Sequence, residues 1–251
     1  MPKIVLVTGA SSGFGRETVK MFAKDGYKII AIGRRQERLK ELKKELSECD
    51  IYTISLDIRD KKEVFDAIEN LPLEYKNIDI LVNNAGLALG LEKAQNALIE
   101  DWEVMIDTNI KGLLYITKAV LPRMIKRKSG YIFNLGSIAG NWPFKGANVY
   151  GSTKAFVQQF SLNLRNDLKD TNIRVTNIEP GFAKTEFSKI RFKNDDKKAD
   201  SVYDGFQPLV GKDIANIIFM LSKLPLHVNV NTLEVMPTAQ TWAGFALEQN
   251  C

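Results

Sequence analysis

The sequence predicts a doubly wound α/β fold in which helices cover both faces of a seven-stranded parallel sheet. Short runs of β-branched apolar residues recur along the chain and alternate with polar–apolar stretches of helical period. This alternation is typical of βαβ crossovers, which place parallel strands side by side in one sheet. The predicted strands are residues 4–7, 29–32, 51–56, 80–82, 131–135, 175–178 and 228–235.

The stretches between these strands predict helices over residues 37–46, 62–70, 102–124 and 155–168. No internal repeat, low-complexity tract or Pro/Gly-rich linker divides the chain, so residues 1–251 are expected to form one domain. Residues 181–211 interrupt the alternation with mixed charges and aromatic side chains. Loops of this length inside a domain are usually lids or binding loops, and a disordered surface excursion is the alternative. We expect a substrate-binding loop here.

The composition excludes several kinds of chemistry. The chain has one histidine, His227, and two cysteines, Cys49 and Cys251, so it cannot assemble a Cys/His zinc site by itself. Two cysteines so far apart do not suggest a disulfide framework but the thiol usage of a reducing compartment. Without a signal peptide or an apolar run long enough to cross a membrane, the expected location is the cytoplasm.

The net charge of +5 does not by itself predict nucleic-acid binding. The basic residues are spread along helical segments and mostly alternate with acidic ones, and only Lys126-Arg127-Lys128 forms a tight run. A solvated helix end explains that run more simply. We therefore expect neither a nucleic-acid partner nor a membrane.

A glycine-rich turn follows the first strand. Residues 3–7 lead into Thr8-Gly9-Ala10-Ser11-Ser12-Gly13-Phe14-Gly15, and a helix is predicted over residues 16–24. Gly9 lets the chain turn sharply, and Gly13 and Gly15 permit close approach of a pyrophosphate and tight helix packing. The helix N-terminus then offers free N–H groups to the anion. A plain strand-to-helix turn is the alternative, but the position after the first strand of a βαβ series favours a Rossmann-type dinucleotide site.

The end of the second strand predicts the choice of cofactor. An acidic residue near this point would bind the adenosine ribose hydroxyls and repel the extra phosphate of NADP, but the sequence here is Gly33-Arg34-Arg35. Gly33 leaves room, and the two guanidinium groups suit a 2′-phosphate. We therefore predict NADP(H) rather than NAD(H), with the start of a solvated helix as the alternative reading of the two arginines.

A tyrosine and a lysine are candidates for proton transfer. With histidine nearly absent, a general acid or base must be a carboxylate, Lys, Tyr or Cys. Tyr150 and Lys154 stand at positions i and i+4, where a helix brings a phenol and an ammonium together and the positive charge favours the phenolate. Ser137 follows the strand at residues 131–135, at the carboxyl end where parallel sheets bind ligands. Its hydroxyl could hydrogen-bond a substrate oxygen.

Taken together, these motifs resemble those of the short-chain dehydrogenases/reductases, and the resemblance covers nearly the whole chain. The glycine turn, Asn83-Asn84-Ala85-Gly86 after the fourth strand, and Pro180-Gly181 with Thr185 occur in the family's order. Ser137, Tyr150 and Lys154 match its catalytic residues, Asn109 its water-supporting asparagine, and Asp57 the acid beside adenine. The residues expected to bind the cofactor are Gly9, Ser11, Ser12, Gly13, Phe14, Gly15, Arg34, Arg35, Asp57, Asn83, Ala85, Gly86, Tyr150, Lys154, Pro180, Gly181 and Thr185.

The resemblance implies a mechanism. Hydride would pass between the nicotinamide and a carbinol or carbonyl carbon while Tyr150 exchanges a proton with the substrate oxygen. Ser137 would orient that oxygen, and Lys154 would lower the tyrosine pKa and hold the nicotinamide ribose. Asn109 would connect Lys154 to solvent through water. A protein that senses NADPH without turnover is the non-enzymatic alternative, and the intact catalytic set disfavours it.

Within this family the chain is most similar to NADP-dependent dehydrogenases of 3-hydroxy acids, which oxidise serine and allo-threonine and reduce malonic semialdehyde. The similarity lies in residues 86–90, 107–112, 141–143, 185–188, 191–192, 231–234 and 236–237. A small carboxylate substrate needs a cation, and Arg191 could form a bidentate pair with it or be a surface residue on the loop. A 3-oxoacyl thioester or general carbonyl reductase is the alternative function. The resemblance also suggests a homotetramer, with helices at 102–124 and 150–168 forming one interface and the C-terminal strand another, although apolar residues of these helices could simply face their own sheet.

Overall fold

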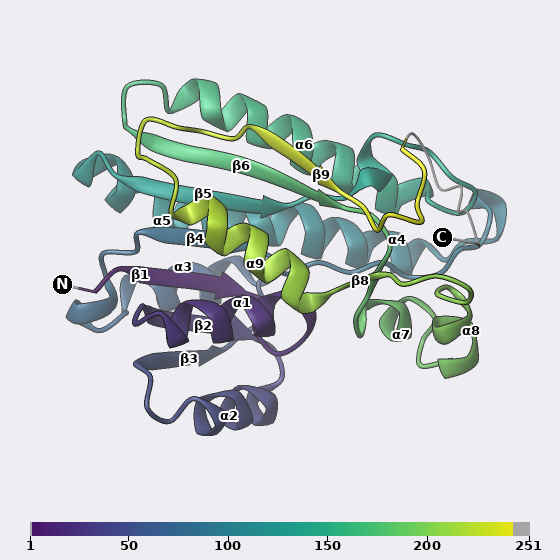
Figure 1. Ribbon diagram of the computed structural model, residues 1–251, viewed down its shortest axis with the longest axis horizontal. Helices are drawn as coiled ribbons and strands as arrows, with labels where there is room; N and C mark the ends of the chain where they lie inside the picture. The colour runs from purple at the N-terminus through teal and green to yellow at the C-terminus, as the bar shows by residue number, and fades with distance from the viewer. Residues whose placement is uncertain (1, 243–251) are drawn as a thin grey trace.

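The computed structural model describes residues 2–242, whose centre is a seven-stranded parallel sheet (Figure 1). The strand order is β3-β2-β1-β4-β5-β6-β9, so the direction of winding reverses between β1 and β4. Each neighbouring pair of strands is parallel, which confirms the predicted fold class. The strands are β1 (Ile4–Thr8), β2 (Lys28–Gly33), β3 (Ile51–Ser55), β4 (Ile80–Asn83), β5 (Gly130–Leu135), β6 (Ile173–Pro180) and β9 (Thr232–Val235).

Helices cover both faces of the sheet and divide the core into two layers (Figure 1). Val5 and Val7 of β1 pack in the layer under α1, α2 and α9, whereas Ile4 and Leu6 pack in the layer under α3, α5 and α6. Because both faces are buried, the strands are continuous apolar runs rather than alternating ones. The helices are α1 (Gly13–Lys24), α2 (Gln36–Glu45), α3 (Lys61–Glu69), α4 (Ile99–Ile106), α5 (Leu113–Arg127), α6 (Asn148–Asp167) and α9 (Gly211–Ser222).

Several boundaries differ from the sequence prediction. The helix expected over residues 102–124 is two helices, α4 and α5, joined by a π-helical turn at Asp107–Gly112. Gly112 lets this turn pack closely on Ile58, whose Cδ1 would lie 2.6 Å from a Cβ at that position. The helix expected to begin at 155 begins at Asn148, so Tyr150 and Lys154 lie in its first two turns. The last strand starts at Thr232, four residues later than predicted.

Residues 181–211 contain short elements rather than an extended loop. They comprise β7 (Ala183–Lys184), α7 (Phe187–Arg191), α8 (Asp196–Ser201) and β8 (Leu209–Val210), and β7 pairs in parallel with β8. Figure 1 shows α7 and α8 beyond the carboxyl ends of the strands. The remaining short helices are η1 (Leu73–Tyr75), η2 (Ala94–Asn96) and η4 (Ile138–Gly140). No helix within residues 2–242 is both long and apolar enough to cross a membrane.

Candidate active site

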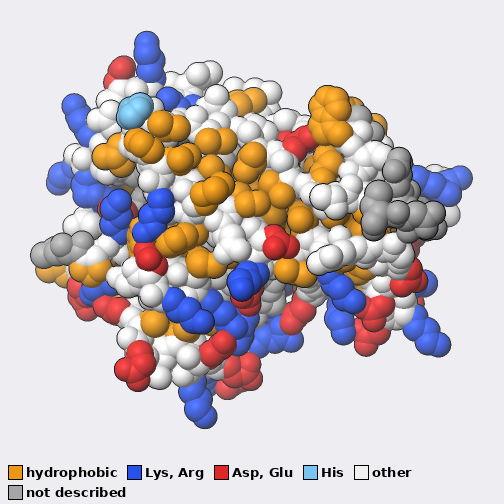
Figure 2. Space-filling view, in the orientation of Figure 1, with side chains coloured by type: hydrophobic (Ala, Val, Ile, Leu, Met, Phe, Trp, Pro, Cys, Tyr) orange, Lys and Arg blue, Asp and Glu red, His pale blue; other side chains and the backbone are white. Residues whose placement is uncertain are grey.

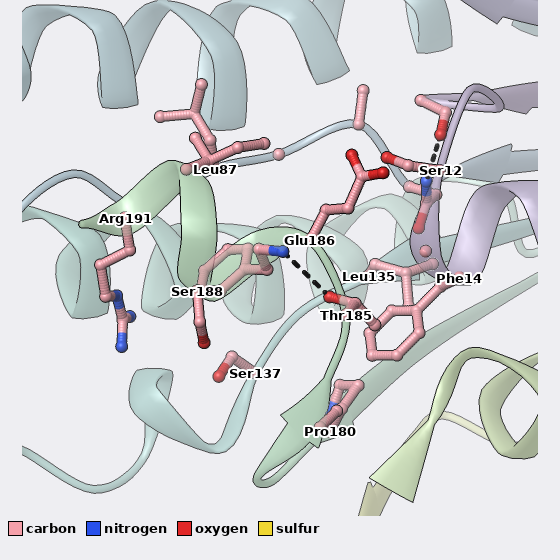
Figure 3. Close-up of a pocket in the computed structure, with 18 of the residues that line it drawn as sticks. Ser12, Phe14, Leu87, Leu135, Ser137, Pro180, Thr185, Glu186, Ser188 and Arg191 are labelled. Carbon is pink, nitrogen blue, oxygen red and sulfur yellow. Dashed lines mark hydrogen bonds between the residues drawn. The ribbon is translucent and has the colours of Figure 1, made fainter. Parts of the chain in front are cut away.

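A cavity of about 440 Å³ opens at the carboxyl ends of the strands. Open α/β sheets bind ligands where the winding reverses, which here is the position between β1 and β4. Ser12 and Phe14 of the glycine-rich turn lie at one end of the cavity, and Ser137 and Arg191 lie at the other (Figure 3). The cavity therefore joins the predicted dinucleotide site to the predicted catalytic residues.

The glycine-rich turn has the geometry of an anion site. Gly9 and Gly13 adopt left-handed backbone conformations, with φ of 66° and 51°, which glycine tolerates without strain. A Cβ at Gly15 would lie 2.4 Å from the carbonyl oxygen of Gly9, so only glycine fits where α1 crosses the turn. The side chain of Ser12 does not cap α1, which leaves the first N–H groups of the helix available to a phosphate.

The segment that follows β4 holds the glycine-rich turn in place through hydrogen bonds. Thr8 Oγ1 accepts hydrogen bonds from the backbone N–H groups of Asn84 and Ala85, both at 3.0 Å. Asn84 Nδ2 donates to the carbonyl oxygen of Thr8 at 2.9 Å. These contacts fix the turn relative to the fourth strand and place Ala85 and Gly86 in the wall of the cavity.

Arg35 crosses the cofactor end of the cavity. Its Nη2 donates to the hydroxyls of Ser11 and Ser12 at 3.0 and 2.7 Å, and its Nη1 donates to Glu186 at 2.8 Å. Arg38 donates to the same carboxylate at 2.5 Å. Burial works against ionisation of Glu186, but hydrogen bonds from Arg38 and Arg35 outweigh it and lower the pKa of the carboxyl. Glu186, from the segment after β6, thus forms an ion pair with Arg35, whose guanidinium is predicted to bind the 2′-phosphate.

Arg34 also lines the cavity, but its partner is Asp57, with Nη1 3.7 Å from Oδ2. Arg59 holds Asp57 more closely, at 2.9 and 2.6 Å from Nε and Nη2. Burial opposes ionisation of Asp57, yet the hydrogen bonds from Arg59 lower its pKa. Asp57 is therefore an anion at neutral pH, at the side of the cavity where an adenine is expected.

Ser137 and Tyr150 come together at the other end of the cavity. Both are 9% exposed, and the Ser137 hydroxyl lies close enough to the Tyr150 phenol to act on its pKa. The Ser137 hydroxyl also accepts from the N–H of Ala139 at 3.1 Å, which fixes it at the start of η4. Burial raises the pKa of Tyr150, while the charge of Arg191 and the hydrogen bond to Ser137 act in the opposite direction. The pair can present two hydroxyl groups to a single substrate oxygen.

Lys154 lies close to Tyr150 but is directed elsewhere. Its Nζ is 5.9 Å from the centre of the Tyr150 ring and donates to the carbonyl oxygen of Leu135 at 2.7 Å. Burial lowers the pKa of Lys154 to about 8. The charge that counteracts the effect of burial on the pKa of Tyr150 in this structure is that of Arg191. A lowering of the tyrosine pKa by Lys154 stays a prediction.

Asn109 lies behind the cavity wall, in the π-helical turn. Its Nδ2 donates to the carbonyl oxygen of Leu87 at 2.8 Å and to Thr153 at 3.0 Å, and its Oδ1 accepts from the N–H of Leu87. Gly86 separates it from Lys154, because a Cβ there would lie 3.2 Å from Asn109 Oδ1 and 3.5 Å from Lys154 Nζ. Asn109 therefore fixes the segment that lines the cavity beside Lys154.

Arg191 reaches the catalytic end of the cavity from α7. Its guanidinium carbon lies 5.1 Å from the centre of the Tyr150 ring and 5.0 Å from that of Phe187. Its Nε is buried and has no hydrogen-bond partner among the described residues, whose ion pairs do not include Arg191 either. A half-buried guanidinium whose buried Nε is unused has the chemistry to receive an anionic group.

The structure brings most of the predicted site residues to the cavity wall. Three do not line it: Gly15 is packed inside α1, Asn109 stands behind Gly86, and Asn83 points into the interior, where its Nδ2 donates to Thr117 and Asn134. Asn83 is therefore placed as a support of the sheet rather than as a cofactor contact through its side chain. The predicted residues that do line the cavity are Gly9, Ser11, Ser12, Gly13, Phe14, Arg34, Arg35, Asp57, Ala85, Gly86, Ser137, Tyr150, Lys154, Pro180, Gly181, Thr185 and Arg191.

The sequence reasoning missed Glu186 and Arg38. Glu186 lies in a segment that resembles relatives but was not expected to bind the cofactor, and Arg38 was not among the expected site residues. The spacing of Arg38 three residues after Arg35, on the same side of α2, was the available signal. Within residues 2–242, His, Cys, Asp and Glu form no group of three that could hold a metal, and Cys251 lies outside the described residues.

Comparisons with known proteins find relatives over nearly the whole chain. An NADP-dependent 3-hydroxy acid dehydrogenase, YdfG of Escherichia coli, is 56% identical over 242 residues, covering 96% of this chain and 97% of the relative. Sulfoacetaldehyde reductase 2 of Chromohalobacter salexigens is 51% identical over 252 residues and is covered completely. The structure of a serine dehydrogenase in its closed form, complexed with NADP⁺, has a TM-score of 0.94 at 55% identity, covering 98% of this chain and all of that one.

A family model described as short chain dehydrogenase matches residues 3–196, which contain the glycine-rich turn and the residues Ser137, Tyr150 and Lys154. This range includes nearly the whole sheet. By its sequence and its fold, the chain belongs to the short-chain dehydrogenase family.

Proposed function

We propose that this protein is an NADP-dependent oxidoreductase that interconverts small 3-hydroxy acids and the corresponding 3-oxo acids or semialdehydes. Serine, allo-threonine and 3-hydroxypropionate are the type substrates. Relatives more than 50% identical over nearly their whole length support the reaction class and the cofactor. The half-buried guanidinium of Arg191, with its unpaired Nε beside Tyr150, is the observation that carries the choice of an acid substrate.

The residues present fit NADP(H). The glycine-rich turn would receive the pyrophosphate on the free N–H groups of α1, and Arg34 and Arg35 would receive the 2′-phosphate. Tyr150, Lys154, Pro180, Gly181 and Thr185 would line the nicotinamide side. When bound, the cofactor supplies or accepts the hydride.

The catalytic side chains divide the remaining work among them. In the reductive direction the Tyr150 hydroxyl donates its proton to the substrate oxygen, and the Ser137 hydroxyl hydrogen-bonds that oxygen and orients it. Lys154 holds the ribose and stabilises the phenolate that remains. Asn109 keeps the segment beside Lys154 in place and would connect Lys154 to solvent through water.

Arg191 would bind the substrate carboxylate and thereby set the distance to the reacting carbon. A guanidinium offers two parallel N–H donors to a carboxylate, and Arg191 presents them within the same wall as Tyr150 and Ser137. The substrate anion would satisfy the unpaired Nε. Residues 181–211, which carry Arg191, are accordingly proposed as the substrate-binding segment.

The experiment is a comparison of substrates with purified protein and NADPH. We expect the highest kcat/KM for malonic semialdehyde and other small 3-oxo acids, a measurable rate for a small sulfonated aldehyde, and little for acetoacetyl thioesters or uncharged ketones. The oxidative direction is measured with 3-hydroxypropionate and serine. Equal or higher kcat/KM for thioesters would favour the alternative, a 3-oxoacyl thioester or general carbonyl reductase.

A homotetramer in the cytoplasm is part of the same proposal. Exposed apolar residues on α4 and α5, Ile99, Ile106 and Ile125, support one interface. Figure 2 shows apolar side chains gathered over β9 and α9, which supports the second at the edge of the sheet. Sedimentation at micromolar concentration tests the assembly, and a monomer would contradict it.

A further inference from the structure

Glu179 is a carboxyl group buried next to the active site without a cation. It lies on β6, one residue before Pro180 of the cavity wall, and is 0% exposed. No ion pair to Glu179 exists among residues 2–242, although buried acids are almost always paired with a cation. The catalytic roles proposed above make no use of it.

An asparagine joins Glu179 to a second carboxylate. Asn141 Nδ2 donates to Glu179 Oε2 at 2.8 Å and to Glu234 Oε1 at 2.9 Å. The two glutamates are register partners on β6 and β9. Trp142 and Trp242 donate their indole N–H groups to Glu234 at 3.3 and 3.0 Å. Both glutamates therefore accept hydrogen bonds from the side-chain amide of Asn141.

This amide belongs to the loop that carries Ser137. Asn141 ends η4, whose first residue follows Ser137, and its N–H donates to the carbonyl oxygen of Ile138 at 3.0 Å. On the other side of the loop, a Cβ at Gly136 would lie 2.5 Å from Asn177 Oδ1. Glu179 therefore bonds to the loop directly at Asn141, and it also bonds to Asn177, which packs against Gly136 at the other end of the loop.

The contacts of Glu179 can accommodate a proton. Glu179 Oε1 lies 2.6 Å from the side-chain amide of Asn177, whose Oδ1 has no hydrogen-bond partner among residues 2–242. Exchanging the amide oxygen and nitrogen of Asn177 would let a protonated Glu179 donate to it. That exchange turns an unpaired oxygen into an acceptor.

The groups that face Glu179 favour the neutral form. Glu234 faces it from β9, Asn141 from the loop after β5 and Asn177 from its own strand, while Lys154 of α6 is directed to the carbonyl oxygen of Leu135. Burial raises the pKa of Glu179 to about 7, with a hydrogen bond from Asn141 opposing the effect and the charge of Glu234 adding to it. The proton would therefore be lost within the physiological range of pH.

We propose that Glu179 is a positioning residue of the reductase: it carries a proton in the active state and, through Asn141, holds the loop that places Ser137. Loss of the proton leaves two carboxylates on one amide, and their repulsion loosens the loop. The effect on turnover rests on the proposed function, whereas the proton on Glu179 does not.

The first test is the pH profile of kcat/KM for reduction of a small 3-oxo acid by NADPH. We expect the wild type to lose activity through an inflection near the pKa of Glu179, about 7. Glu179→Gln, which mimics the protonated acid, should keep the rate at pH 6 and lack this inflection. Glu234→Gln should move it to lower pH by removing the neighbouring charge, and the exposed control Glu48→Gln should leave it in place. An inflection that stays at the same pH in both Glu179→Gln and Glu234→Gln would overturn the proposal.

A second variant tests the connection to Ser137. Asn141→Ala should lower kcat about tenfold, because small misplacements of a catalytic group are costly, while KM for NADPH changes less than twofold. A full kcat in this variant would contradict the role of Asn141.

The third test does not depend on activity. Since folding raises the pKa of Glu179 above the ordinary value of 4.5, its stabilising contribution is present at low pH and is lost as the pH rises through 7. The melting temperature of the wild type should fall relative to Glu179→Gln between pH 5 and 7.5. If the melting temperatures of the two proteins change with pH in the same way, Glu179 does not carry the proton. If they change differently but the protein shows no turnover, only the proposed function is refuted.

Discussion

The guanidinium carbon of Arg191 lies 5.1 Å from the centre of the Tyr150 ring, inside the cavity that also contains the Ser137 hydroxyl. A cation from α7 thus stands beside the phenol of α6, and no acidic residue within 2–242 forms an ion pair with it. Burial raises the pKa of Tyr150, and the charge of Arg191 opposes that rise while its Nε stays available to a substrate anion. Arg191 is therefore placed to bind the charged group of a substrate while it lies beside the proposed proton donor, Tyr150.

Replacing Arg191 tests this link. Arg191→Met should raise KM for 3-hydroxypropionate about 10- to 100-fold, the cost of losing a charge-assisted hydrogen bond, and change kcat/KM for an uncharged ketone only slightly. Lys189→Met is the matched control, because Lys189 lies on the same helix but is exposed. A similar loss for charged and uncharged substrates would contradict a carboxylate-binding role.

Tyr150→Phe removes the proton donor and keeps the ring against Phe187. We expect kcat to fall by a factor of about 100 to 10,000, the usual contribution of a general acid. The affinity for NADPH, measured by fluorescence titration, should stay within a few-fold. Tyr52→Phe, far from the cavity, controls for loss of a phenol, and activity in Tyr150→Phe equal to that control would refute the assignment.

Arg35 should determine the preference for NADPH. Arg35→Ala removes the donors to Ser11 and Ser12 and should raise KM for NADPH about 10- to 100-fold while changing KM for NADH little. Arg165→Ala on α6 is the control for loss of a guanidinium outside the cavity. An equal effect on both cofactors would show that Arg35 does not contact the 2′-phosphate.

Lys154 predicts a dependence of stability on pH. Folding lowers its pKa from 10.5 to about 8, so below pH 8 the folded protein buries a charge at a cost. Between pH 8 and 10.5 the unfolded chain binds the proton more tightly, and the free energy of unfolding should rise with pH. Relative to Lys154→Met, the wild type should gain up to about 1.4 kcal/mol per pH unit between pH 8 and 10, measured by urea unfolding. A constant difference between the two proteins would exclude a lowered pKa.

The fold was predictable because its signals are local. Each buried strand is a run rich in β-branched residues. The glycines of the turn after β1 mark the start of the first crossover, because they occupy backbone conformations that favour glycine. The Tyr150–Lys154 spacing also needs only a helix. Boundaries were less predictable, since the π-helical turn at 107–112 and the early start of α6 depend on packing against other elements.

Part of the site could not be predicted from spacing. Arg35 and Glu186 are separated by 151 positions, and nothing in either local sequence indicates that they pair. The interior placement of Asn83 likewise depends on Thr117 and Asn134 from other elements. Such contacts exist only once crossovers have brought distant segments to the same edge of the sheet.

By itself, the sequence determined the parallel sheet, the anion-binding turn and the set of groups able to move a proton, because these follow from residue type and short-range spacing. The tertiary structure decided the charge states and the partners of those groups. Among residues 2–242, burial and neighbours from other elements place the charge of Arg191 beside Tyr150, direct Lys154 to Leu135 and leave Glu179 without an ion pair. A pKa depends on every charge and dipole around a group, and these are assembled only by the fold.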